Sequence, residues 1–270
     1  MSTTSTAPQR SGSFHGVADL KLIARQTRYE QLSFWLNPIG ALFTVGFSTV
    51  FLLIFESTSG KSTIGSLDGI KLIQYYVPGF VAYGIMSSCF SILSITMVNR
   101  REMGLLKRLR LSPAPTWILL TAVFASTALI TIVQLVLMLA VGRGFGVHGP
   151  SHWLPFLIAL VIGMFGFTAL GMGVSTLVPN ADAAGPVVNI VFFVVLAFSG
   201  LWYPISSGST LSNVMGYLPV RALINALEYS FNAIPHTSEW RWHDILVIVV
   251  WGAAGFLMAL RRWQWAPRRG

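Results

Sequence analysis

Six long apolar runs, each without Asp, Glu, Lys or Arg, constrain this 270-residue sequence more than any other feature. A helix needs about 20 mostly apolar residues to cross the roughly 30 Å hydrocarbon core of a bilayer. Only 10% of the residues are charged, whereas soluble domains typically carry about 25%. We therefore predict an all-α membrane protein with six transmembrane helices, at residues 34–55, 74–98, 117–141, 153–178, 183–202 and 245–260.

The stretch between the fifth and sixth runs, residues 203–234, is apolar but interrupted. It contains Pro204 and Pro219 and carries the charges of Arg221 and Glu228. Broken backbone at membrane depth is tolerated only inside protein or beside a wet cavity, and a charge there is costly. We expect re-entrant or external short helices before the last span, in which Arg221 and Glu228 form a shielded ion pair or contact lipid headgroups.

The basic residues predict the orientation of the six helices. With the N-terminus inside, the cytoplasmic segments hold 13 of the 18 Lys and Arg residues, and the whole net charge of +9 falls on that side. This positive-inside asymmetry explains a basic composition that would otherwise suggest nucleic-acid binding. We predict a multi-pass protein of the cell membrane, inner or plasma, with both termini in the cytoplasm and no nucleic-acid partner. Residues 1–15 should form a disordered tail and residues 263–270 a basic cytoplasmic tail.

The segment before the first run, residues 16–33, has an amphipathic pattern. On a helix, Leu20 and Ile23 lie on one side, and Lys21 and Arg25 lie on an adjacent side. Such a helix can lie in the cytoplasmic interface with its basic side facing anionic headgroups. We predict an interfacial amphipathic helix here, with a solvated helical linker as the alternative.

No set of residues typical of catalysis or metal binding stands out. The five histidines are scattered over the loops and the tail. Gly60-Lys61-Ser62-Thr63 ends like a phosphate-binding loop, but Phe55 stands where that motif needs its first glycine. The six runs contain no charged side chain for a proton relay, which argues against a proton-coupled antiporter. We expect no catalytic, cofactor or metal site in this chain.

Two local patterns bear on packing. Ala169 and Gly173 are four residues apart, as are Gly171 and Ser175, and small residues at this spacing let membrane helices approach closely. Asp182, just before the fifth run, is expected to cap its helix.

The loop between the second and third runs holds the densest cluster of basic residues. On a helix that starts at Arg101, Leu105 and Leu109 share one face and basic side chains cover the rest. Pro113 ends this helix before the third run. We expect a short amphipathic coupling helix at the cytoplasmic surface, suited to docking a partner protein.

Two motifs carry a family resemblance. Pro78-Gly79 lies near the start of the second run, and the loop that follows this run reads Arg101-Glu-x-Gly-x-x-Lys-Arg-Leu-x-x-x-Pro113. With these residues, the chain resembles the membrane subunits of ABC-2 type exporters, a group that includes daunorubicin-resistance-like drug permeases and the permeases of lipid and polysaccharide export. The six runs, the amphipathic N-terminal segment and the broken region before the last run are similar too.

The resemblance implies a transport subunit that is not itself an enzyme, with its transmembrane domain at residues 34–262. A separate nucleotide-binding subunit would bind ATP and Mg and dock at the loop after the second run. The chain would pair with a second copy of itself or with a sister permease, surrounded by membrane lipids. The residues assigned in this way to ATPase coupling are Arg100, Arg101, Glu102, Gly104, Leu105, Lys107, Arg108 and Leu109.

Mild polar residues in and between the runs are candidates for a translocation path, although each hydroxyl can equally bond within its own helix. They are Ser48, Ser87, Ser91, Asn189, Tyr203, Pro204 and Pro219. The substrate would be an amphipathic drug or lipid. The alternatives are a polysaccharide or glycolipid and, from another class of protein, an integral membrane enzyme that modifies lipids. Charge reversal at Arg101 or Lys107 should uncouple export and leave membrane insertion intact.

Overall fold

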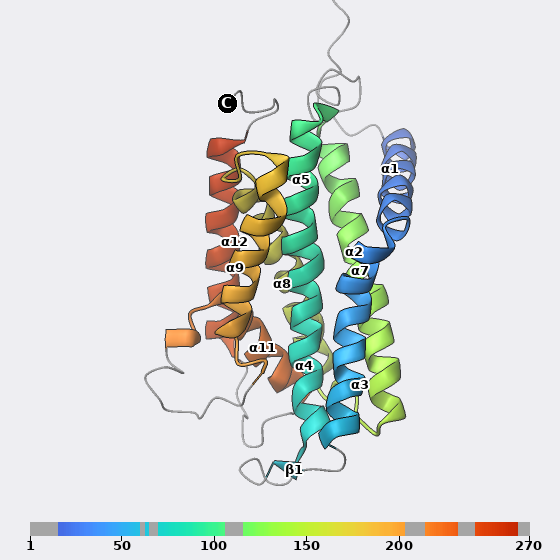
Figure 1. Ribbon diagram of the computed structural model, residues 1–270, viewed down its shortest axis with the longest axis vertical. Coiled ribbons are helices and arrows are strands. Elements are labelled where there is room, and N and C mark those ends of the chain that lie inside the picture. Colours follow the sequence, from blue (N-terminus) through green and yellow to red (C-terminus); the bar gives the residue numbers. More distant parts are fainter. Residues whose placement is uncertain are drawn as a thin grey trace, which may run out of the picture.

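The computed structural model describes residues 16–59, 63–64, 70–105, 116–202, 214–231 and 241–263, most of which lie in helices that run along one common axis (Figure 1). Strands β1 (Thr63–Ile64) and β2 (Ile70–Lys71) form a short antiparallel ladder, and the rest of the described secondary structure is helical. In chain order, the helices are α1 (Val17–Trp35), α2 (Pro38–Ala41), the π-helix η1 (Leu42–Gly46), α3 (Phe47–Ser59), α4 (Leu72–Ile85), the π-helix η3 (Met86–Ile92), α5 (Leu93–Glu102), α7 (Thr116–Gly144), α8 (Trp153–Ser175), α9 (Ala181–Ala197), α11 (Pro219–Ser230) and α12 (Trp242–Arg262).

Five helical stretches are long and apolar enough to cross a membrane, and they confirm five of the predicted runs. The run expected at 183–202 differs, because α9 has only 17 residues and is about 26 Å long. The chain turns after α9 at Gly200, whose φ of +77° is a left-handed conformation that glycine adopts without strain. The predicted count of six full spans is therefore not confirmed. The five long stretches are Pro38–Thr58, Ile73–Glu102, Trp117–Gly144, Trp153–Ser175 and Trp242–Arg262.

Helix α1 is present where the amphipathic segment was expected, but it runs alongside α7 (Figure 1). The hydroxyl of Thr27 donates to the carbonyl of Ala122 over 3.4 Å, and the amide of Gln31 donates to the carbonyl of Ser126 over 2.8 Å. Because these contacts advance together along both chains, the two helices run in the same direction. That α1 lies in the cytoplasmic interface, and is not a solvated linker, stays a prediction.

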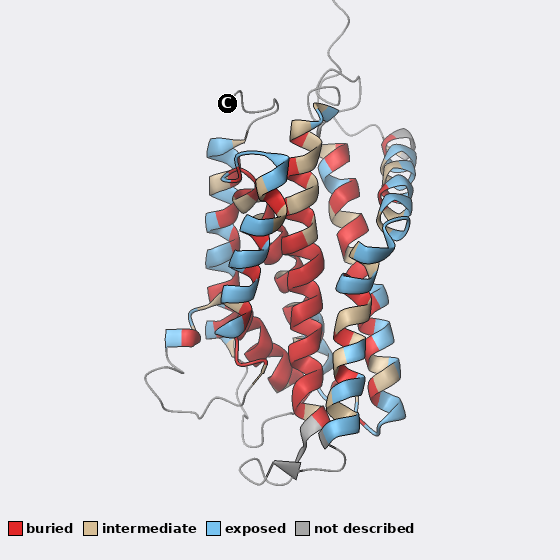
Figure 2. Cartoon of the chain, in the orientation of Figure 1, coloured by how far each residue is buried: buried red, intermediate tan, exposed pale blue. Residues whose placement is uncertain are grey.

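The continuous helix α4–η3–α5 forms the centre of the bundle, and Figure 2 shows it buried along most of its length. Of its most apolar stretch, 83% is enclosed by neighbouring helices. Gly79, in the Pro-Gly motif, allows a close contact, since a Cβ atom there would lie 2.5 Å from the Cδ1 atom of Leu201. The π-helical segment η3 widens the helix in its middle, a feature that is frequent at functional sites.

Helices α8 and α12 pack through glycines. A Cβ atom on Gly173 would lie 2.5 Å from the carbonyl oxygen of Gly255, and one on Gly252 would lie 2.9 Å from the Cα atom of Gly166. The two backbones therefore touch directly, as small residues allow in membrane helices. This contact confirms the close packing predicted from the small residues of the fourth run.

Helix α11 is the described part of the interrupted region, and it is enclosed at the end of the bundle opposite α1 (Figure 1). Every residue of α11 except Tyr229 is buried. Pro219 occupies the first helical position, where its missing N–H costs nothing. A short helix inside the protein is one of the forms that the sequence predicted here.

Candidate functional site

The end of the bundle at which α5 and α12 finish and beside which α1 lies carries most of the described basic residues (Figure 1). We call it the basic end. The basic end holds Lys21, Arg25, Arg28, Arg100, Arg101, Arg261 and Arg262, whereas the opposite end holds Lys71, Arg143, Arg221 and Arg241. The asymmetry that the sequence predicted is therefore present among the residues that the structure describes.

Arg101 joins the end of α5 to the end of α8. Its side chain is only 4% exposed, and its guanidinium donates to the carbonyls of Ser175 (3.3 Å), Val178 (2.8 Å) and Pro179 (3.1 Å). These carbonyls lie at and beyond the carboxyl end of α8, where backbone acceptors lack helical partners and a positive charge is favoured. The Nε atom of Arg101 also donates to Glu102 over 3.0 Å. Arg101 therefore faces inward, although the sequence placed it among the residues that contact a partner.

Arg100 joins the end of α5 to α1. Its Nη1 atom donates to Glu30 Oε1 over 2.8 Å, and its Nη2 atom pairs with Glu30 Oε2. The amide of Gln26, one turn earlier in α1, also donates to Glu30 over 3.0 Å. Both partners are nearly buried, so this two-pronged ion pair fixes the position of α1 against α5.

Gly104 ends the helix immediately after this double junction. The last residue of α5 is Glu102, and Gly104 has a φ of +69° with its N–H donating to the carbonyl of Arg101. This is the left-handed stop that glycine commonly supplies. The continuous helix expected from Arg101 onward is therefore interrupted at Gly104. Leu105 is exposed, and Lys107, Arg108 and Leu109 lie outside the described residues.

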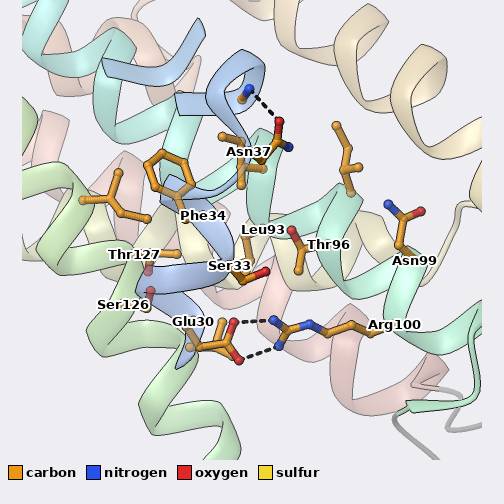
Figure 3. A pocket seen from close by; sticks show the side chains of 15 residues that line it. Glu30, Ser33, Phe34, Asn37, Leu93, Thr96, Asn99, Arg100, Ser126 and Thr127 are labelled. Carbon is orange, nitrogen blue, oxygen red and sulfur yellow. Dashed lines mark hydrogen bonds and ion pairs between the residues drawn. The ribbon is translucent and has the colours of Figure 1, made fainter. Parts of the chain in front are cut away.

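A cavity of about 310 Å³ lies between α1, α5 and α7, with the Arg100–Glu30 pair at one side (Figure 3). Polar residues and apolar residues both line it. The polar ones include Ser33, Thr96 and Asn99, and the apolar ones include Phe34 and Ile92. A neighbouring cavity of about 500 Å³ shares Arg100 and Glu30 and is also lined by Tyr29, Met103 and Leu105.

The candidates for a translocation path do not line one common cavity among the described residues. Ser48 accepts a hydrogen bond from Gln134 over 2.9 Å, between α3 and α7. Ser87 is buried in η3, and Ser91 donates to Asn189 of α9 over 3.2 Å. Among the described residues, the Ser91–Asn189 hydrogen bond is thus the one that joins two of the candidates directly. Tyr203 and Pro204 lie outside the described residues.

At the opposite end, α11 carries a buried ionisable cluster. Arg221 Nη1 lies 3.7 Å from Glu228 Oε1, and it donates to the carbonyl of Ser199 over 3.4 Å. This is the shielded ion pair that the sequence predicted as one alternative. Burial raises the pKa of Glu228 to about 7, and the charges of Arg221 and Arg241 oppose this rise. Among the described residues, Glu228 Oε2 has no hydrogen-bond partner.

The comparison with known proteins decides the family. The family model described as "ABC-2 type transporter" matches residues 22–232, which is most of the chain. The chain belongs to the ABC-2 type transporter family. It is also similar to a protein of Bacillus subtilis (strain 168) with the printed name "Putative transport permease YvfS". The two are 22% identical over 184 residues, which cover 66% of this chain and 71% of the relative.

Sequence reasoning about this ABC-2 permease missed the partners of the two arginines. Glu30 is the one acidic residue between Asp19 and Glu56. It follows Gln26 by four residues, and this spacing on a helix indicated that the two side chains could contact each other. The carbonyls that hold Arg101 carry no sequence signal, because any residue supplies a backbone oxygen.

The cap of helix α9 was predicted two residues too late in the sequence, since Asn180, not Asp182, accepts from the N–H of Ala183 over 2.9 Å. No group of three or more His, Cys, Asp or Glu side chains suited to a metal occurs in the described part of the chain.

Proposed function

We propose that this ABC-2 permease is the membrane subunit of an ATP-driven exporter and that a separate subunit hydrolyses the ATP. In this proposal, the ATPase subunit binds at the basic end, where the loop after α5 begins. The permease moves an amphipathic drug or lipid across the membrane. Neither ATP nor Mg binds to this chain, and no further cofactor is needed.

The double junction at Arg100 and Arg101 is the observation that supports this mechanism best. Two consecutive side chains bind the end of α5 to α1 on one side and to the end of α8 on the other. A force applied to the loop that follows Gly104 therefore reaches three helices together. Because α5 continues through η3 into α4, the same force acts along the central helix of the bundle.

The basic end faces the cytoplasm in this proposal. The positive-inside bias supports this orientation, since most of the described basic residues lie there. Helix α12 also ends on this side, and α1 lies beside it (Figure 1). Both chain termini would then be cytoplasmic, on the side where ATP is available to the partner subunit.

A second permease, identical or a sister chain, is expected to cover the outer face of α9. Ile190, Phe193 and Val194 are exposed there, and so is Asn189. Asn189 Oδ1 accepts from Ser91, but its NH2 group has no partner among the described residues; an NH2 group that faces lipid is unfavourable, whereas a neighbouring helix can accept from it. Cross-linking through Asn189→Cys in native membranes should therefore yield a dimer. A chain that remains monomeric under these conditions would contradict the dimeric arrangement.

Co-purification and ATPase assays on charge-reversal variants test the coupling surface. Full-length chain purified from its native membrane should carry an ATP-binding subunit, and Lys107→Glu should weaken that association about tenfold or more, as expected for a charged contact at an interface. Lys21→Glu, on an exposed residue of α1 at the same end, is the matched control. Reproducible absence of an ATP-binding subunit from the wild-type preparation would overturn the proposal.

Arg101 has a different expected role from Lys107. Because its guanidinium is buried among carbonyls, Arg101→Glu would place a carboxylate against backbone oxygens and would destabilise the chain itself. We therefore assign Arg101 to positioning the loop. Wild-type substrate-stimulated ATPase activity in Lys107→Glu would contradict the assignment of partner contact to Lys107.

A further inference from the structure

The cavity between α1, α5 and α7 presents hydrogen-bonding groups that the protein itself does not use. Ser33, Thr96 and Asn99 line it, and their side chains have no hydrogen-bond partner in the described part of the chain. The guanidinium of Arg100 has five N–H donors, of which Glu30 accepts two. Figure 3 shows Ser33 and Thr96 on the same side of the Arg100–Glu30 bridge. Several donors thus converge on one space.

The two charged residues of the cavity lie at its end near the membrane surface, and large apolar side chains line it farther along the spans. Arg100 lies two residues from the end of the stretch Ile73–Glu102, which is about 3 Å along the helix. Ile92, eight residues away from Arg100 toward the bundle centre, is about 12 Å deeper. Phe34 and Ile130 add apolar surface from α1 and α7, and Asn37 is a polar residue near the depth of Ile92. A charged group at the membrane surface with a hydrocarbon chain below it is the arrangement of a phospholipid.

The charge of the cavity wall favours a particular headgroup. The charges of Arg100 and Glu30 cancel one another. A purely anionic headgroup is therefore only weakly attracted by the arginine and is repelled by the carboxylate. A zwitterionic headgroup can place its phosphate near the free N–H groups of Arg100 and Asn99 and its cation near Glu30. A primary ammonium also donates hydrogen bonds to a carboxylate, whereas a trimethylammonium cannot. Ethanolamine therefore fits this wall better than choline or glycerol.

We propose that this cavity holds the headgroup of a phosphatidylethanolamine molecule from the leaflet at the basic end. The phosphate binds Arg100, Asn99 and Thr96, and the ammonium binds Glu30. The lipid fills the space between α1 and α5 and reinforces the junction that Arg100 forms. The site does not depend on which substrate is exported.

Lipid retention tests this proposal on the full chain without an ATPase subunit. The chain is reconstituted into vesicles with equal amounts of phosphatidylethanolamine, phosphatidylcholine and phosphatidylglycerol, extracted in mild detergent, and its retained lipids are counted by mass spectrometry. We expect wild type to retain one phosphatidylethanolamine in preference to the other two. Thr96→Val and Asn99→Ala should each lower this retention about tenfold, as expected for one hydrogen bond to a charged group.

Controls separate a lipid site from a structural effect and from a simple anion site. Thr121→Val removes an exposed hydroxyl that bonds within α7, and it should leave retention unchanged. Thermal unfolding of Thr96→Val without added lipid should match wild type, since its hydroxyl has no partner in the described part of the chain. Equal retention of the three lipids, or wild-type retention in Thr96→Val and Asn99→Ala, would overturn the proposal. Stabilisation of the delipidated chain by inorganic phosphate as strong as that by phosphatidylethanolamine would overturn it too.

Discussion

Arg101→Ala removes the guanidinium that joins α5 to the end of α8. The variant loses the hydrogen bonds to the carbonyls of Ser175, Val178 and Pro179, and it leaves Glu102 without its ion-pair partner. A hydrogen bond to a charged group contributes about 1.5–3 kcal/mol, but bonds that share one guanidinium are not additive. We expect a local loss of about 3–5 kcal/mol, which is typical when one partner of a buried ion pair is removed.

Amide hydrogen exchange measures this loss where it occurs. Each 1.4 kcal/mol corresponds to a factor of about ten, so exchange at residues 173–180 should become at least about 100 times faster in Arg101→Ala. Arg101→Lys keeps the charge but loses the planar fork, so its exchange should lie between those of wild type and Arg101→Ala. Arg262→Ala removes an exposed arginine at the same end and should change stability by no more than about 0.5 kcal/mol.

Wild-type exchange over residues 173–180 in Arg101→Ala would refute this role of the guanidinium. That result would mean that the carbonyls at the end of α8 find other partners at no cost. It would also remove the physical basis for assigning Arg101 to positioning the loop.

Two further predictions concern other parts of the bundle. Gly255→Ala should lower the thermal stability of the detergent-solubilised chain by several degrees, because its Cβ atom would lie 2.6 Å from the Cα atom of Leu170; Gly185→Ala, which meets nothing within 4 Å, should leave it unchanged or raise it. Glu228 has a folded-state pKa of about 7 against an ordinary value of 4.5. Between pH 4.5 and pH 7 its carboxyl group is therefore protonated in the folded chain and ionised in the unfolded chain. The free energy of unfolding should therefore fall by about 3 kcal/mol as pH rises through this window. Glu228→Gln should abolish this pH dependence in thermal unfolding measured across the window. An unchanged pH dependence would mean that another group causes it.

Long apolar runs predicted the helices well, because a chain in lipid must satisfy its backbone groups within each segment. The same reasoning overestimated α9, since apolarity continues to Trp202 whereas the helix ends at Ala197. Hydropathy cannot detect this end. The turn at Gly200 and the close approach of Leu201 to Gly79 depend on tertiary contacts.

The candidate site was predictable in location but not in the direction of its side chains. The Arg-Glu-x-Gly motif pointed to the end of the second span, and the structure places a junction of three helices there. Whether an arginine faces a partner or the protein interior depends on its register relative to α1 and α8. That register is set by contacts between residues 70 to 78 positions apart in the sequence. The periodicity within one segment carries no information about such contacts.

The position of α12 has a consequence for synthesis of the chain. It is the last of the described helices to be made, yet it supplies the glycine contact of α8 and packs against α11. Asp244, which accepts a hydrogen bond from Asn225 and pairs with Arg241, reaches the ionisable cluster only with this helix. Until α12 leaves the ribosome and inserts, the nascent chain holds polar groups of α11 uncovered at the edge of an unfinished bundle. The nascent chain should therefore be most vulnerable to membrane quality-control proteases just before its final helix docks.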